Sequence, residues 1–249
     1  MYLSDIHTHS IASGHGTTCT ISDMAKEASH KGLKLLGISD HGPGTLTSGT
    51  SSYFRSLPFC PKKRFGIDVL YGVELNILDI DGHIDLSDDL LNGLDYAIIS
   101  MHQQNYRSGA AAENTLAYIN AMKHPAVKVL GHCDDPHFPV DYRTLAIAAL
   151  QENVIFEINE ASLSPNGYRG DTTSNATEIL YFCHEIWRFR SFLSKSTVTE
   201  KIMMGDLHLF RRICPPGYVS GITDSQQSDS KTEVFSFRHA KSSISGYDP

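Results

Sequence analysis

Residues 127–162 read VKVLGHCDDPHFPVDYRTLAIAALQENVIFEINEAS, and this stretch contains one complete structural repeat. VKVLGHCDD begins with a short apolar run that predicts a buried strand. YRTLAIAALQEN has the spacing of an amphipathic helix, and VIFEINEAS predicts a second strand. Continuous apolar strands separated by amphipathic helices are typical of a parallel sheet that is covered by helices on its outer face.

The same alternation runs through the first two thirds of the chain. Further strands are predicted over residues 2–7, 33–41, 65–78 and 95–103, and further helices over residues 21–32, 113–124 and 173–185. About six repeats of this unit favour a closed or nearly closed β/α barrel over an open sheet. The sequence therefore predicts the α/β class. Residues 47–66 are predicted to be a loop that interrupts the alternation.

The pattern degrades after Ile186. From Trp187 onward nine Lys and Arg residues stand against six Asp and Glu residues. One further strand candidate, KIMMGD, is followed by an aperiodic Ser-rich end. We therefore expect a barrel over residues 1–210, with the option that it is incomplete at its C-terminal end. Residues 211–249 are expected to form an atypical and poorly ordered tail.

Composition narrows the class of protein. The chain has 249 residues and a net charge of −7, which argues against a nucleic-acid-binding surface. The five cysteines form no C-x-x-C pair, which suits reduced thiols in a cytosolic protein. No signal peptide and no membrane-spanning run is apparent, so we expect a cytoplasmic protein that does not associate with membranes. Thirteen histidines are the unusual feature, and they fit a metal protein.

A potential metal ligand stands at the end of one predicted strand after another. In chain order these residues are His7 and His9, His41, Glu74, His102 and His132. The carboxyl ends of the strands form the active-site rim in β/α barrels, so we expect these side chains to meet. A single histidine at a strand end is more often a satisfied polar residue. Ligands at five successive strand ends favour metal coordination instead.

The ligand set is rich in imidazole, contains a carboxylate and has no thiolate placed at a strand end. This set suits zinc, manganese or iron. The set also contains more residues than a single four-coordinate ion can bind. Glu74 is the obvious carboxylate to bridge two ions, which would clamp both oxygens of a displacement reaction.

The ordered series DIHTHS, ISDHG, GVELN, SMH and GHCD, with His15 after the first motif, resembles the PHP family of polymerase-and-histidinol-phosphatase metal hydrolases. The chain looks most like the short stand-alone bacterial phosphatases of that family, over residues 1 to about 185. The resemblance implies a distorted seven-stranded β/α barrel, a cluster of two or three divalent transition metal ions, and hydrolysis of a phosphoester.

The resemblance also implies a distribution of ligands. One ion would be held by His7, His9 and Glu74, and a second by Glu74, His102 and His132. His15 and His41 would hold a third ion. The family pattern closes with Asp-x-His on the last strand, and its best match here is Asp206 and His208 in IMMGDLHLF. That segment must pair as a strand beside the first strand if these two residues complete the cluster.

The predicted reaction is metal-dependent hydrolysis of a phosphomonoester of a small metabolite. Arg169 lies on the loop after the last clear strand, where it is either a solvated charge or a phosphate clamp. Asp40 or solvent would protonate the leaving alkoxide. A small phosphorylated substrate is the expected partner, and a homo-oligomer is an option.

Two alternatives stay open at this stage. The first is an amidohydrolase-like metal hydrolase, because barrels with H-x-H on the first strand also cleave C–N bonds. A lysine at a strand end would favour this reading, and no predicted strand ends in lysine. The second is a metal-binding relic without catalytic activity, which the atypical C-terminal end favours.

Overall fold

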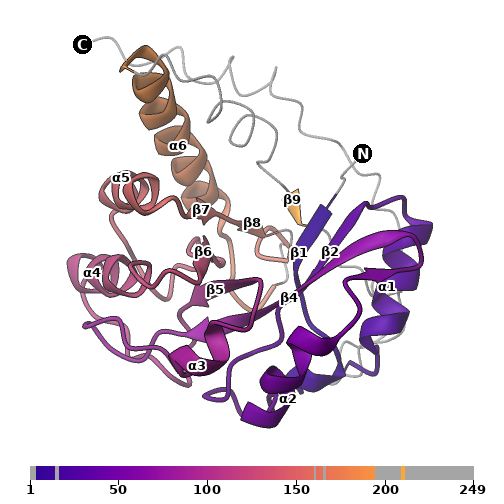
Figure 1. Ribbon diagram of the computed structural model, residues 1–249. Helices are drawn as coiled ribbons and strands as arrows, with labels where there is room; N and C mark the ends of the chain where they lie inside the picture. The colour runs from indigo at the N-terminus through magenta and orange to yellow at the C-terminus, as the bar shows by residue number, and fades with distance from the viewer. Residues whose placement is uncertain (1–3, 15–16, 160, 165–166, 194–208, 211–249) are drawn as a thin grey trace, which may run out of the picture.

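A curved parallel sheet with helices on its outer face forms the centre of the molecule (Figure 1). The structure is a computed structural model that describes residues 4–14, 17–159, 161–164, 167–193 and 209–210. The strands of the main sheet are β1 (Ser4–Thr8), β2 (Leu35–Ile38), β3 (Lys63–Arg64), β4 (Ile67–Asn76), β5 (Tyr96–Ser100), β6 (Val127–Leu130) and β7 (Ile155–Phe156). They pair in the order β1-β2-β4-β5-β6-β7, all parallel, while β3 pairs antiparallel with β4.

The helices connect these strands and lie outside them (Figure 1). They are α1 (Ile21–His30), α2 (Ser51–Ser56), α3 (Asp88–Leu91), α4 (Ala111–Ala121), α5 (Tyr142–Glu152) and α6 (Thr173–Leu193). Local sequence explains their ends: Thr20 and Asp23 form a capping box at the start of α1, and Asp141 caps α5. None of the helices in the described ranges is long and apolar enough to span a membrane.

The two faces of the sheet bury different sets of side chains. Along β5, Ala97 and Ile99 belong to the large core between sheet and helices, whereas Tyr96 and Ile98 belong to a smaller inner cluster. This alternation follows from the two-residue period of a strand. The inner cluster is completed by Val129 and by the partly buried Ile6, Leu70 and Ile155, one residue from each of four further strands. A floor of apolar side chains therefore lies inside the curve of the sheet.

Tyr96 fills this interior because two glycines make room for it. A Cβ atom on Gly37 would lie 2.4 Å from the Tyr96 hydroxyl, and one on Gly72 would lie 2.6 Å from Cε1 of the same ring. The hydroxyl donates a hydrogen bond of 2.5 Å to the carbonyl oxygen of Ile6 on β1. The buried phenol therefore links β1 to β5 across the sheet.

The last strand changes partners at Glu157. Residues 154–162 were expected to form one strand, but β7 pairs with β6 and β8 (Ile158–Asn159) pairs with β9 (Leu209–Phe210). In turn, β9 lies beside β1, so the strands follow one another around most of a ring (Figure 1). The predicted α/β class and distorted barrel are confirmed.

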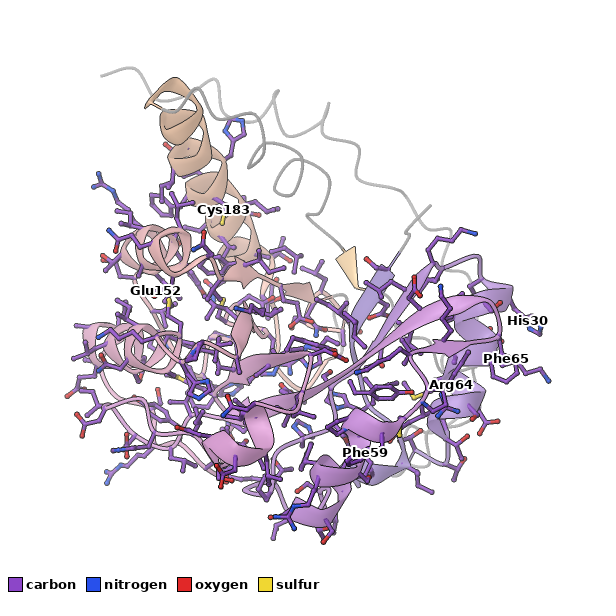
Figure 2. The ribbon with its side chains drawn as sticks, in the orientation of Figure 1. His30, Phe59, Arg64, Phe65, Glu152 and Cys183 are labelled. Atoms are coloured by element: carbon purple, nitrogen blue, oxygen red, sulfur yellow. The ribbon has the colours of Figure 1, made fainter. Side chains whose placement is uncertain are left out.

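The prediction that residues 47–66 form a loop is wrong. They include α2 and β3, and Thr50 caps α2 by accepting a hydrogen bond from the backbone of Tyr53. Arg64 on β3 donates to Ser22 of α1, and the turn that follows carries Phe65 to the outer end of α1 near His30 (Figure 2). Short elements of this kind give little periodic signal, because a six-residue helix and a two-residue strand are too short to show a repeat.

Helix α6 is longer than the sequence indicated. The helical pattern was expected to end near residue 186, but α6 continues to Leu193 and packs against α5. The four cysteines in the described part of the chain, Cys19, Cys60, Cys133 and Cys183, are free thiols, as the sequence led us to expect. Cys183 lies on α6 (Figure 2).

Candidate metal centre

Glu74 lies at the centre of a cluster of imidazoles inside the curve of the sheet. Its side chain is 1% exposed, and nitrogen atoms of five histidines lie within 3.4 Å of its two oxygens. The nitrogens nearest Oε2 belong to His41 (2.9 Å), His7 (3.2 Å) and His9 (3.4 Å), and those nearest Oε1 belong to His132 (2.8 Å) and His102 (3.4 Å). All the strand-end ligands predicted within the described residues therefore meet at one point.

The strands explain this convergence. Glu74 lies two residues after Gly72 on β4, so both residues face the interior. His102 follows Ile98 and Ser100 along the interior face of β5 and the residues after it. On β1 the register with β2 shifts between Asp5 and Thr8. The shift lets Ile6 and His7 both contact the interior.

Glu157, a carboxylate that sequence analysis missed, contacts His7 on the side of the ring that faces away from Glu74. Oε1 of Glu157 lies 2.8 Å from Nδ1 of His7, and Oε2 accepts a hydrogen bond of 2.8 Å from the backbone N–H of His132. His132 has a φ of 28°, which is uncommon for a residue other than glycine, and this hydrogen bond supports its turn. Glu157 is fully buried, so its side chain acts inside the centre.

An amide and a second carboxylate hold His102 in the same way. Nδ1 of His102 lies 2.7 Å from Oδ1 of Asn76, while the Asn76 backbone N–H and Nδ2 both donate to Asp85. Because Asp85 can only accept, it fixes the Asn76 amide with its oxygen toward His102. Nδ1 of His102 must then carry the proton, and Nε2 presents its lone pair toward Glu74.

Burial and neighbouring charges determine the protonation of Glu74 and of the histidines around it. Burial opposes ionisation of Glu74, but His41, His7 and His102 outweigh it and hold the pKa of this carboxyl well below its usual range. Burial also opposes the charged form of His7, yet the carboxylates of Glu157 and Glu74 raise the pKa of His7 well above its usual range. Burial and the nearby Arg169 lower the pKa of His132 to about 4, so this imidazole is neutral.

These donors fit divalent metal ions. Oε2 of Glu74 is buried and makes no hydrogen bond with proper geometry to any described residue, although imidazole nitrogens surround it. A buried carboxylate oxygen that has no hydrogen bond but is surrounded by imidazole nitrogens is placed as a ligand of an ion would be. Three groups in the described part of the chain have ligand atoms within 4.8 Å of one another. Two of them lie at this centre and share Glu74, namely His7–His9–Glu74 and His41–Glu74–His102, while the third, Asp79–Asp81–His83, lies on the loop after β4. The second group contains His41, whereas the family resemblance implied that His41 belongs to a third ion.

Arg169 lies at the edge of the centre. Its Nη1 donates to Oγ of Ser162 (3.1 Å), and its Nε lies 3.7 Å from Oδ2 of Asp135. The guanidinium also lies 4.5 Å from the centre of the Tyr168 ring. The residue is 7% exposed, and Nε makes no hydrogen bond within the described part of the chain. A buried cation with an unused donor beside a metal centre suits an anion.

The remaining predicted site residues are placed differently. Asp40 is fully buried behind the cluster and accepts hydrogen bonds from three neighbouring residues, so the arrangement does not favour its predicted role as a proton donor. His15, Asp206 and His208 lie outside the described residues. Their assignment as ligands stays a prediction. The predicted tail over residues 211–249 also lies outside the described part.

The residues that sequence analysis missed carried a readable signal. Glu157 follows the apolar residues VIF on a predicted strand, as His41 and His132 follow theirs. Asn76 lies two residues after Glu74 and therefore on the same face of β4. Both residues lie near the end of a predicted strand, which is the rule that located the histidines. The rule was not applied to Glu157 or to Asn76.

A β/α barrel with a histidine-rich centre at the carboxyl ends of its strands has the arrangement of metal-dependent hydrolase barrels. The chain matches the PHP domain model over residues 5–161. It belongs to the PHP domain family, as its motif series indicated.

Several relatives are similar over most of their length. A probable phosphatase of Clostridium novyi is 37% identical over 182 residues, which cover 73% of each chain. One from Caldicellulosiruptor saccharolyticus is 35% identical over 208 residues, or 80% of this chain and 85% of the relative. The family and these relatives identify a phosphatase, which confirms the predicted enzyme class.

One solved structure is also similar to this chain. It is the histidinol phosphate phosphatase of Lactococcus lactis, complexed with zinc, L-histidinol and phosphate. Its sequence is 15% identical, the match covers 73% of this chain and 82% of that chain, and the TM-score is 0.46.

Proposed function

We propose that the protein hydrolyses the phosphomonoester of a small metabolite at a centre of two or three divalent transition metal ions. The observation that supports this most strongly is the position of Glu74, a buried carboxylate whose two oxygens face different sets of imidazoles. A carboxylate with ligands on both sides is the arrangement needed to bridge two ions. Imidazole and carboxylate donors favour zinc, manganese or iron.

Bound divalent ions at such a centre lower the pKa of water toward neutrality and neutralise charge on a phosphoryl group. The chain's own residues prepare the centre for this chemistry. Glu157 and Asn76 each hold the Nδ1 side of one histidine, so that Nε2 of His7 and Nε2 of His102 face Glu74. Orientation of this kind places the ligands before any ion binds and reduces the cost of forming the site.

Arg169 would bind the phosphoryl oxygens of the substrate. The guanidinium is held by Ser162 and by the Tyr168 ring, and its charge acts on His132 at the centre. A fixed, buried guanidinium binds a phosphoryl group more strongly than a mobile surface charge does, because it loses little freedom on binding. We therefore propose that Arg169 is a phosphate clamp, the second of the two roles weighed from the sequence.

Turnover of p-nitrophenyl phosphate with added manganese or zinc tests the proposal. We expect hydrolysis that a chelator abolishes and that re-added metal restores. A panel of sugar, nucleotide and amino-alcohol phosphates would then define the substrate class. A folded, metal-loaded protein that hydrolyses none of these esters would contradict the proposal and favour the relic, whereas cleavage of amide substrates would favour the amidohydrolase-like alternative.

A further inference from the structure

Behind the cluster, Asp40 accepts four hydrogen bonds, two at each oxygen of its carboxylate. Oδ1 accepts from the backbone N–H of Ser10 (2.6 Å) and from Oγ of Ser13 (2.7 Å). Oδ2 accepts from Oγ of Ser10 (2.7 Å) and from the hydroxyl of Tyr53. Asp40 is fully buried. Both oxygens are therefore occupied by donors from the loop after β1 and from α2.

These contacts determine the hydrogen bonding of Ser13. Its oxygen lies 2.7 Å from Oδ1 of Asp40, 3.1 Å from the backbone nitrogen of His41 and 3.1 Å from Nδ1 of His9. A hydroxyl has one proton and two lone pairs. The proton goes to Asp40, which can only accept, and one lone pair accepts the N–H of His41. The remaining lone pair faces His9.

Only one arrangement of His9 is compatible with these contacts. All three contacts of Ser13 are satisfied only if Nδ1 of His9 carries a proton and donates it to the hydroxyl oxygen. Nε2 of His9 then presents a lone pair toward Glu74, 3.4 Å away. The outcome for His9 matches that for His102, but it is reached through a hydroxyl that could otherwise donate or accept.

We propose that Ser13 and Asp40 are positioning residues that fix His9 in the tautomer able to bind metal through Nε2. The inference rests on the proposed metal centre. Asp40 acts through Ser13, because it commits the serine proton and so forces the serine to accept from His9. Ser13 also accepts the N–H of His41, so the pair couples the loop after β1 to the end of β2.

Asp40→Asn distinguishes this role from proton donation. The amide oxygen of asparagine would take the place of Oδ1, because the backbone N–H of Ser10 needs an acceptor there, and Ser13 would still donate to it. The amide NH₂ would take the place of Oδ2, which faces two hydroxyls able to turn and accept. The asparagine therefore preserves the orientation of Ser13, although it removes the carboxyl group.

The experiment compares Ser13→Ala, Asp40→Asn and Asp40→Ala in the full chain, with Tyr53→Phe as the matched control. Tyr53 donates only to the oxygen that Ser13 does not touch. Zinc affinity is measured by competition with a chromophoric chelator, and histidine tautomers by ¹⁵N NMR of the zinc-free protein. We expect Ser13→Ala and Asp40→Ala to weaken zinc binding about 10–100-fold and to abolish the protonated Nδ1 signal of His9. Asp40→Asn and Tyr53→Phe should stay within about threefold of the wild type.

The outcomes separate the two proposals. If wild-type protein binds no zinc, the proposed metal centre is wrong. If wild-type protein binds zinc and Ser13→Ala binds it as tightly with the His9 signal unchanged, the positioning role is wrong. Asp40→Asn losing zinc as completely as Asp40→Ala would also overturn it, because the asparagine keeps the required acceptor. If Asp40→Ala fails to fold, judged by circular dichroism, Ser13→Ala and Asp40→Asn still decide the question.

Discussion

Nδ1 of His7 lies 2.8 Å from Oε1 of Glu157, although the two residues are 150 positions apart in the chain. The contact joins the first strand to the end of β7 through the middle of the barrel. It also sets the chemistry of the centre, because an ionised carboxylate can only accept and so keeps a proton on Nδ1 of His7. Two buried carboxylates, Glu157 and Glu74, thus lie on opposite sides of one imidazole.

Glu157→Gln should weaken metal binding about 10–100-fold even though the side chain keeps its shape. Both carboxylate oxygens face donors, Oε1 toward His7 and Asn159 and Oε2 toward the backbone N–H of His132. The glutamine NH₂ must therefore meet a donor in either orientation. Titration with zinc against a competing chelator measures the effect.

Asp40→Asn is the matched comparison for Glu157→Gln, because both variants change an acid to its amide. In Asp40→Asn, however, the new NH₂ group can take the place of Oδ2 and donate to the hydroxyls of Ser10 and Tyr53. Equal losses of zinc affinity in the two variants would show that charge, and not the direction of hydrogen bonding, controls the centre.

Glu74→Gln should reduce hydrolysis about 100-fold or more, because a glutamine keeps the shape of the side chain but weakens a bridge between two ions. Removal of a single histidine should cost less, since the other ligands remain. Steady-state rates with p-nitrophenyl phosphate at saturating manganese compare Glu74→Gln with His102→Ala. An active Glu74→Gln enzyme beside an inactive His102→Ala enzyme would show that Glu74 is not the bridge.

Purified protein should contain at least two transition metal ions per chain after growth with zinc and manganese. The reason is that two groups of candidate ligands share Glu74. Elemental analysis of the protein, with the concentration from amino-acid analysis, gives the stoichiometry. Less than about half an equivalent of total metal would contradict a multinuclear centre.

Asp206→Asn and His208→Ala test the predicted closing motif in the full chain. The strand β9 (Leu209–Phe210), which follows the motif in the chain, lies beside β1. If both residues are ligands, each variant should lose metal and activity, with a fall of about 10-fold or more in affinity. Wild-type metal content and rate in both variants would remove Asp206 and His208 from the ligand set.

Gly37→Ala should lower the free energy of unfolding by about 1–3 kcal/mol through overpacking. The added methyl group would lie 2.4 Å from the Tyr96 hydroxyl and 2.7 Å from Cα of Ile6. Urea denaturation followed by circular dichroism measures the change. In a Tyr96→Phe background the same substitution should cost less, because the hydroxyl is gone. An equal cost in both backgrounds would assign the strain to Ile6 alone.

The order of the strands and the identity of most of the central residues could be predicted from the sequence. Apolar runs separated by amphipathic helices are local patterns, and the alternation of side chains along a strand determines which residues share a face. His102 and Glu74 could be placed at strand ends for this reason. The short elements α2 and β3 escaped prediction because they carry too few residues to show a period.

Only the tertiary structure decided how each imidazole is held. The partners of His7, His102 and His9 are Glu157, Asn76 and Ser13, which reach them from distances of 150, 26 and 4 residues along the chain. No local pattern pairs a histidine with a carboxylate 150 residues away. The pairing arises because parallel strands bring their carboxyl ends to one edge of the sheet, where hydrogen bonds join residues by position in space and not by order in the chain.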